Sequence, residues 1–167
     1  MKRATLVFPL LAGDRPTVLL GEKQRGFGVG KWNGFGGKMA PGEAPRDAAV
    51  RELLEECSLR ASPEDLLPAG HLVYLFPEAQ EWDHDVQVFV LERWSGKPEA
   101  SEEMHPRWFA VDELPFGTMW SDDPHWLPLV LAGAVVEARF VFASDNERVE
   151  SSSVRRLGFW RAERAPT

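Results

Sequence analysis

The stretch Gly37-Lys38-Met39-Ala40-Pro41-Gly42-Glu43, followed after seven residues by Arg51-Glu52-Leu53-Leu54-Glu55-Glu56, joins a glycine-containing loop to a helix that ends in carboxylates. If residues 44–57 are helical, the three glutamates of the second stretch lie three or four residues apart and share one face. The opposite face is then apolar and consists of Val50, Leu53, Leu54 and Cys57. The sequence predicts a helix with one core-facing side and one strongly acidic side.

The acidic side of this helix is unfavourable as plain scaffold. Like charges four residues apart, as in Glu52 and Glu56, cost about 0.2–0.5 kcal/mol per pair on an exposed helix. Carboxylates near a helix C-terminus also oppose the helix dipole. Three oxygen ligands on one patch suit a hard divalent cation such as Mg²⁺ or Mn²⁺. From the glutamates alone, a solvated acidic face with an ordinary ion pair between Arg51 and Glu55 is an equal alternative.

The complete spacing is more specific than the glutamates alone. Written as Gly37-x5-Glu43-x7-Arg51-Glu52-Leu53-x-Glu55-Glu56-x-Ser58-Leu59, it resembles the signature of the Nudix hydrolases. That resemblance implies a loop-helix-loop that binds divalent metals and a diphosphate. The sequence departs from the family at Ser58, where the family has glycine. A serine held there in the left-handed conformation costs on the order of 1 kcal/mol, which affects local stability and not the chemistry.

The rest of the chain predicts a mixed α/β (α+β) domain. Segments rich in Val, Phe or alternating residues predict strands at 4–11, 17–21, 70–76, 85–93, 107–110, 138–143 and 149–157. Asp122-Asp123-Pro124 is typical of a helix start, before the apolar residues 126–131. We therefore expect one domain over residues 1–160, with a mixed β-sheet between helices as in the Nudix fold, and a C-terminal tail at 161–167.

Composition limits the classes of partner. The chain has 167 residues and a formal net charge of −7, which argues against binding to a nucleic acid polymer or an anionic membrane, since phosphates are bound through basic patches. A free nucleotide remains possible if a metal screens the acidic site. The single cysteine, Cys57, permits no internal disulfide and fits a reducing compartment. We expect a cytoplasmic monomer.

The glycine segment at residues 25–38 predicts a turn that contacts a ligand. It is not a Walker loop, because Met39 follows Lys38 where serine or threonine is required. It is not a Rossmann fingerprint either, because Lys31 stands at the third glycine position. Embedded aromatic residues and Asn33 favour a ligand-contacting turn over a flexible surface loop.

A second, narrower resemblance covers about residues 5–157. The chain is similar there to the oxidised-purine nucleoside triphosphate diphosphatases, which are MutT homologues. The residues that carry it are Arg25-Gly26-Phe27-Gly28, Trp32-Asn33-Gly34-Phe35-Gly36-Gly37-Lys38, Met119-Trp120, Asp122-Asp123 and Trp126. The resemblance implies metal-dependent hydrolysis of 8-oxo-dGTP, 2-hydroxy-dATP and similar triphosphates to the monophosphate and pyrophosphate. This activity sanitises the nucleotide pool.

The same resemblance implies the residues of the site. The metal ligands that it implies are Glu52, Glu55, Glu56, the backbone carbonyl of Gly36 or Gly37, and Glu103. The substrate contacts that it implies are Thr5, Lys23, Phe27, Asn33, Phe35, Gly36, Gly37, Lys38, Tyr74, Phe76, Trp120, Asp122 and Asp123. Two adjacent aspartates normally only accept hydrogen bonds, so we expect burial and mutual repulsion to keep at least one of them protonated.

For the reaction we expect in-line attack of an activated water on the β-phosphorus. Glu52 is the first candidate for the base and Glu56 the second, while Arg51 orients the glutamates. Two alternatives stay open: a Nudix hydrolase of dinucleoside polyphosphates, nucleotide sugars or caps, and a noncatalytic Nudix nucleotide sensor. Asp122 has a simple N-cap role as its alternative. We expect Asp83-His84-Asp85 to be a solvated strand start and not a metal cluster.

Overall fold

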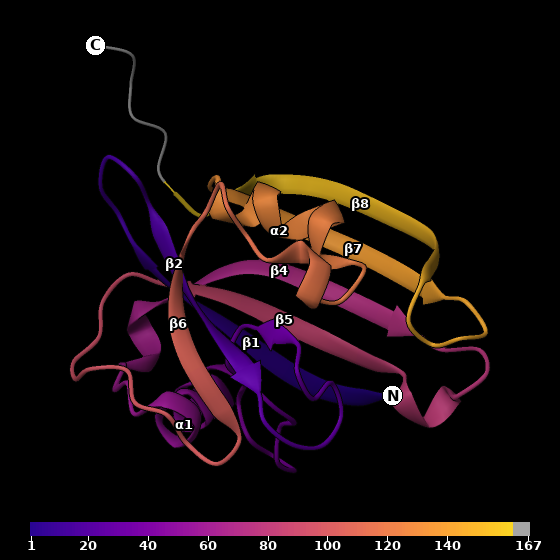
Figure 1. The fold of residues 1–167 in the computed structure, drawn as a ribbon, viewed down its shortest axis with the longest axis horizontal. Coiled ribbons are helices and arrows are strands. Elements are labelled where there is room, and N and C mark those ends of the chain that lie inside the picture. The colour runs from indigo at the N-terminus through magenta and orange to yellow at the C-terminus, as the bar shows by residue number, and fades with distance from the viewer. Residues whose placement is uncertain (162–167) are drawn as a thin grey trace.

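The computed structural model describes residues 1–161, so the expected tail lies almost entirely outside the described residues. Within this part of the chain, two α-helices, α1 (Pro45–Cys57) and α2 (Asp123–Leu131), lie on opposite sides of a mixed sheet (Figure 1). The strands are β1 (Lys2–Leu11), β2 (Thr17–Lys23), β3 (Trp32–Asn33), β4 (Leu66–Leu75), β5 (His84–Leu91), β6 (Met104–Ala110), β7 (Ala134–Phe142) and β8 (Val149–Phe159). Short 3₁₀ turns occur at Pro63–Asp65, Gln80–Trp82 and Phe116–Thr118.

The strand order is β3-β2-β1-β5-β4-β7-β8, and β6 pairs with β2 outside this path. β1 is parallel to β5 and β4 is parallel to β7, while the other pairs are antiparallel. The predicted fold class, a mixed sheet between helices, is confirmed. No helix within residues 1–161 combines the length and the apolarity needed to cross a membrane.

The sheet separates two apolar clusters, and β1 contributes to both. Val7 packs in the cluster under α1 with Leu53, whereas Phe8 packs in the cluster under α2. The ring centroids of Phe8 and Trp126 are 5.9 Å apart. Successive residues of a strand point to opposite faces, so one short strand supplies side chains to both helices.

Several strands begin earlier than the sequence predicts. β4 begins at Leu66 instead of residue 70, and its register shifts between Pro68 and Gly70. Proline and glycine are weak strand formers, but pairing with β5 on one side and β7 on the other extends β4 through this irregular stretch. The two-residue strand β3 was not predicted, because a pair of residues between glycines carries no periodic signal.

Helix α1 ends where predicted and begins one residue later, at Pro45, but its predicted faces are wrong at two positions. Glu56 is only 3% exposed, whereas Leu54 is 37% exposed. The reason is the glycine segment, which crosses the end of the helix: the Gly36 N–H donates a 2.7 Å hydrogen bond to Glu56 Oε1. One glutamate therefore belongs to the buried side of the helix, and a leucine takes its place in solvent.

Ser58 ends α1 in the left-handed conformation that its position predicts, with φ 66° and ψ 13°. We expect Ser58→Gly to raise the free energy of unfolding by up to about 1 kcal/mol, because glycine has no Cβ to strain there. Urea denaturation measures the change. Ser62 has an ordinary extended conformation with φ −86°, so Ser62→Gly is the matched control and gains nothing. An equal gain in both variants would contradict the strain argument.

Candidate active site

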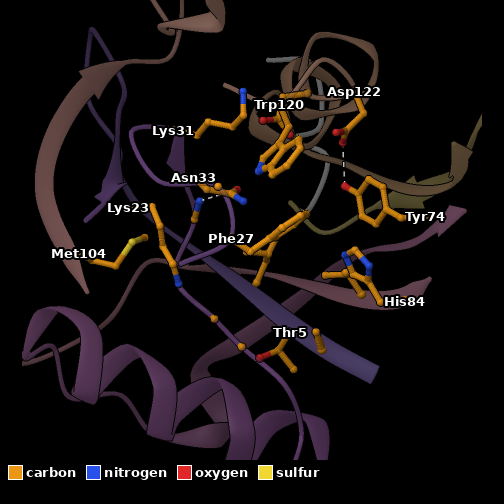
Figure 2. Close-up of a pocket in the computed structure, with 18 of the residues that line it drawn as sticks. Thr5, Lys23, Phe27, Lys31, Asn33, Tyr74, His84, Met104, Trp120 and Asp122 are labelled. Atoms are coloured by element: carbon orange, nitrogen blue, oxygen red, sulfur yellow. Dashed lines mark hydrogen bonds between the residues drawn. The ribbon is translucent and has the colours of Figure 1, made fainter. Parts of the chain in front are cut away.

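A pocket of about 200 Å³ opens between the glycine segment and the start of α2. Lys23 and Asn33 lie on one side of it, and Tyr74 and His84 lie on the other (Figure 2). Eleven of the thirteen substrate contacts suggested by the resemblance line this pocket: Thr5, Lys23, Phe27, Asn33, Gly36, Gly37, Tyr74, Phe76, Trp120, Asp122 and Asp123. The fold thus gathers residues that are far apart in the sequence around one cavity.

Two predicted contacts lie elsewhere. Phe35 is fully buried in the cluster under α1, because it pairs with Val7, whose side chain also faces that helix. Its ring does not reach the pocket. Lys38 has an exposed side chain outside the pocket, and its carbonyl accepts a 3.3 Å hydrogen bond from Arg51 Nη2. Neither residue lines the pocket.

The two adjacent aspartates are both buried, at 1% exposed for Asp122 and 2% for Asp123. Asp122 Oδ2 accepts hydrogen bonds from the Tyr74 hydroxyl at 2.7 Å and from Trp126 Nε1 at 2.9 Å. Its side chain makes no N-cap bond to α2, although the residue stands at that position. Capping therefore does not account for this aspartate.

The two aspartates have different hydrogen-bond partners, and these partners shift their pKa values differently. Burial raises the pKa of Asp122, but the hydrogen bonds from Tyr74 and Trp126 oppose that shift. Burial also raises the pKa of Asp123 well above its usual value, and the neighbouring Asp122 raises it further. Asp123 Oδ2 has no hydrogen-bond partner within residues 1–161. Asp122 is thus the member of the pair that ionises more readily, and Asp123 the one that holds a proton more readily.

Two further polar groups face the cavity. Asn33 Oδ1 accepts a 2.8 Å hydrogen bond from the Gly34 N–H, which leaves the Asn33 amide NH₂ as a donor toward the pocket. The Thr5 hydroxyl is buried and has no partner within the described chain. Buried polar groups are normally paired, so a free hydroxyl at a pocket wall indicates a place for a ligand atom.

Aromatic rings form the mouth of the pocket. Phe27 stacks on Trp120 with ring centroids 5.0 Å apart, and its edge meets Trp82 at 5.0 Å. Gly28, with φ 81°, lies against Trp120, so a Cβ there would come within 3.2 Å of the indole. Lys31 Nζ lies 4.9 Å from the Trp120 ring centroid. These rings offer flat surfaces on which a base can stack.

His84 lines the pocket, although the sequence predicted a solvated strand start at this position. Its ring stacks on Tyr74 at 4.9 Å and on Phe76 at 6.2 Å, between centroids. The preceding Asp83 is also structural, since Asp83 Oδ1 accepts a 2.7 Å hydrogen bond from the Phe76 N–H. The sequence signal that could have identified His84 as a pocket residue is the alternation along β5. Residue 84 lies on the same face of that strand as buried Val86. Lys31 and Met104 also line the pocket and were not predicted.

The glycine segment lies directly against the glutamates of α1. A Cβ on Gly36 would stand 1.7 Å from the Thr5 carbonyl oxygen, and one on Gly37 would stand 2.7 Å from the Glu52 carboxylate. The Thr5 N–H donates to the Gly37 carbonyl at 3.0 Å. No hydrogen bond within residues 1–161 uses the Gly36 carbonyl, which makes it the better metal-ligand candidate of the two.

Arg51 organises the acidic groups around it. Its Nε and Nη2 each donate a 2.9 Å hydrogen bond to Glu43, and its Nη1 donates to Glu52 at 2.9 Å and to Glu55 at 3.5 Å. The Arg51 guanidinium holds the pKa of Glu43 down to about 2. Burial raises the pKa of Glu52, and it raises that of Glu56 to about 8. Arg51 therefore compensates the repulsion that the sequence predicts.

The fit to a divalent cation rests on the donor types. No group of three or more His, Cys, Asp or Glu side chains within residues 1–161 lies close enough to hold a metal. Glu55 is turned toward Arg51, and Glu103 pairs with Arg25 at 3.5 Å and Lys23 at 4.0 Å. The candidate ligands are nevertheless all oxygens, the donor type that Mg²⁺ requires, and Gly36, Gly37 and Glu56 among them line the pocket. A cation there would need Glu52 and Glu55 to exchange Arg51 for the metal.

Gly37→Ala tests the close approach of the loop to Glu52. We expect kcat to fall by about 10- to 100-fold, because the added methyl displaces a carboxylate that must be held precisely in place. Stability should change little, since the contacting atoms end a movable side chain. Steady-state kinetics and thermal melting measure the two effects. Gly117→Ala, whose Cβ would meet no atom within 4 Å, is the control, and an equal rate loss there would contradict the argument.

The sequence profile of the NUDIX domain matches residues 1–130, and the chain belongs to this family of hydrolases. Its members are generally dependent on divalent metals. The chain is similar to the oxidized purine nucleoside triphosphate hydrolase of Mus musculus, at 44% identity over 84% of this chain and 87% of the relative. The protein of that description from Danio rerio is 46% identical over 89% of this chain and 92% of its own length.

A solved structure supports the fold independently. The crystal structure of a MutT protein from Bacillus halodurans matches with a TM-score of 0.74 and covers 92% of this chain and 97% of its own. Its sequence identity of 22% is low, so this match shows the shared fold alone. The mixed sheet and its helices are therefore a frame that the two proteins share.

Proposed function

We propose that this protein hydrolyses oxidised purine nucleoside triphosphates, of the 8-oxo-dGTP and 2-hydroxy-dATP type, to the monophosphate and pyrophosphate, and so sanitises the nucleotide pool. The observation that carries the proposal is that one pocket contains both a candidate base-binding end and a candidate phosphate-binding end. A buried aspartate pair, Asp122 and Asp123, lies at one end, and Gly36 bound to Glu56 lies at the other. The identities to the mouse and zebrafish hydrolases support the substrate class.

The base end of the pocket offers both senses of hydrogen bond. Ionised Asp122 accepts, protonated Asp123 donates, and the Asn33 amide donates from the opposite wall. A purine that carries N–H groups and hydrogen-bond acceptors side by side on one edge can pair with this acceptor and these two donors. The Phe27 and Trp120 rings then cover the flat face of the base.

Two of the proposed metal ligands, Gly36 and Glu56, line the pocket at its proposed phosphate end. Glu52, Glu55, Glu56, Glu103 and the Gly36 carbonyl would hold Mg²⁺, for which Mn²⁺ can substitute. When bound, such an ion neutralises phosphate charge and lowers the pKa of a water. Lys23 lines the same end and is placed to pair with a phosphate oxygen.

The chain's own residues then position and deprotonate the attacking water. Glu52 is the first candidate for the base, held in orientation by Arg51, and Glu56 is the second. The water oxygen attacks the β-phosphorus in line, the base takes its proton, and the bond from that phosphorus to the α-phosphate oxygen breaks. The products are the nucleoside monophosphate and pyrophosphate.

The same proposal includes the setting of the protein. We place it as a monomer in the cytoplasm, with a free nucleotide and no nucleic acid polymer or membrane as its partner. The net charge of −7 supports the last point. Cys57 is buried and unpaired, and burial raises the pKa of its thiol to about 12, so the thiol is inert.

A substrate panel with Mg²⁺ and product identification tests the proposal. It comprises 8-oxo-dGTP, 2-hydroxy-dATP, dGTP, dATP, a dinucleoside tetraphosphate and a nucleotide sugar. The oxidised purines should give the highest kcat/KM, with monophosphate and pyrophosphate as products. Preference for either of the last two substrates would assign another Nudix activity. Tight binding of nucleotides without turnover would identify a sensor.

A further inference from the structure

His84 is a titratable side chain in the base pocket that the proposed reaction does not use. It lies at the start of β5 and lines the cavity with Tyr74 and Asp122. Its ring is fixed on two sides, by Tyr74 with an interplanar angle of 25° and by Phe76 with one of 10°. An imidazole held so firmly presents its nitrogens in fixed directions.

The hydrogen bond of His84 fixes its tautomer. His84 Nδ1 lies 2.6 Å from the Trp82 carbonyl oxygen, and because a carbonyl only accepts, the proton is on Nδ1. Burial lowers the pKa of His84, although the Trp82 carbonyl and Asp122 oppose the shift. The ring is thus neutral at physiological pH, and Nε2 carries a lone pair. Nε2 has no hydrogen-bond partner within residues 1–161.

The position of His84 determines which edge of a base it meets. Asn33 on β3 and His84 on β5 lie on either side of β1 in the sheet, and Figure 2 shows them on opposite sides of the pocket. A purine whose Watson-Crick edge faces Asp122 and Asp123, and whose N3 edge faces Asn33, turns its imidazole edge toward His84. That edge carries position 7.

Oxidation at carbon 8 reverses the hydrogen bonding of position 7. In guanine, N7 is an acceptor, whereas the 8-oxo form carries a proton there and is a donor. A lone pair on Nε2 complements that N–H and repels an N7 lone pair. We propose that His84 reads the N7–H of 8-oxopurines and makes the pocket select them over unmodified purines. This inference rests on the proposed function and names the group that recognises the oxidised edge.

The test compares His84→Leu, which removes the acceptor, with His84→Gln, which keeps one. For 8-oxo-dGTP, His84→Leu should lower kcat/KM about tenfold, the equivalent of one lost hydrogen bond. 2-Hydroxy-dATP keeps an acceptor at N7, so its kcat/KM should stay within about threefold of wild type. The kcat/KM for dGTP should stay the same or rise. His84→Gln should retain most of the preference for 8-oxo-dGTP. His71→Leu, at an exposed histidine outside the pocket, is the control.

The outcomes separate this inference from the proposed function. Selective loss of 8-oxo-dGTP hydrolysis in His84→Leu supports the reading role. An equal loss for 8-oxo-dGTP and 2-hydroxy-dATP, with an unchanged melting temperature, would assign His84 to the pocket wall only and overturn the inference. If His84→Leu does not fold, unchanged selectivity in His84→Gln supports the inference, and lost selectivity in that folded variant overturns it. Wild-type protein that hydrolyses neither oxidised purine would instead overturn the proposed function.

Discussion

Glu56→Gln is expected to lower kcat for pyrophosphate release by about 10²- to 10⁴-fold, the range lost when a base or its metal partner is removed. Glu56 is buried at the end of α1, where Oε1 accepts the Gly36 N–H at 2.7 Å. Glutamine has the same shape, and its amide oxygen can accept that bond. The variant therefore keeps the loop attached to the helix, but its side chain can neither ionise to bind a cation nor take a proton from water.

The measurement is Mg²⁺-dependent turnover of 8-oxo-dGTP at saturating substrate, together with thermal melting. The melting temperature should not fall, because glutamine, like the protonated glutamate, buries no charge. Glu64→Gln, at an exposed position in the turn Pro63–Asp65, is the matched control and should leave turnover unchanged. Normal Mg²⁺-dependent turnover in Glu56→Gln would remove this glutamate from the catalytic site.

The sequence predicted the parts of the site that depend on local spacing. The loop, the helix and the left-handed Ser58 follow from offsets within about twenty residues, and all are present. A glycine position or a helix terminus is decided by backbone sterics that act over a few residues. This is why the end of α1 was predicted correctly even where its sequence departs from the family signature.

The errors occur at residues whose burial or side-chain direction is decided by contacts with residues distant in the sequence. Helical periodicity gave Glu56 an exposed face, but the crossing glycine segment buries it. Phe35 stands among pocket residues in the sequence, yet its pairing with Val7 directs the ring to the α1 side. His84 stands between two aspartates in the sequence, a pattern that indicates solvent exposure. In the fold, the pairing of β4 with β5 stacks Tyr74 on its ring. Strand pairing, which periodicity does not specify, set the positions of Phe35 and His84, and the crossing glycine segment set the burial of Glu56.

The structure also shows how an acidic helix remains stable before any cation binds. Arg51 donates to Glu43, Glu52 and Glu55, so repulsion between Glu52 and Glu55 is neutralised. Glu56 is instead isolated by burial, which keeps its proton in place by raising its pKa to about 8. The charges are thus handled by two different means, an ion-pair network at the surface and protonation in the interior.

Asp122→Asn is expected to change substrate preference more than it changes hydrolysis of the phosphate chain. The asparagine oxygen can keep the bonds from Tyr74 at 2.7 Å and Trp126 at 2.9 Å, which turns the new NH₂ group toward the base. An acceptor becomes a donor at that point. Loss of the charge also lowers the pKa of the neighbouring Asp123, which Asp122 helps to raise. Both changes alter the pattern that reads the base edge.

We expect the ratio of kcat/KM between 8-oxo-dGTP and 2-hydroxy-dATP to shift by about 10- to 100-fold, since a mismatched buried hydrogen bond costs about 1–3 kcal/mol. The kcat should stay within about threefold of the wild-type value. The reason is that Asp122 lies at the proposed base end of the pocket, whereas the glutamates of α1 lie toward the proposed phosphate end. Asp112→Asn, at an exposed aspartate paired with Arg15 on the surface, is the control. A uniform rate loss with no change in selectivity would leave Asp122 a purely structural partner of Tyr74 and Trp126. A shift in the ratio at constant kcat places base recognition in the aspartate pair and separates it from the chemistry on α1.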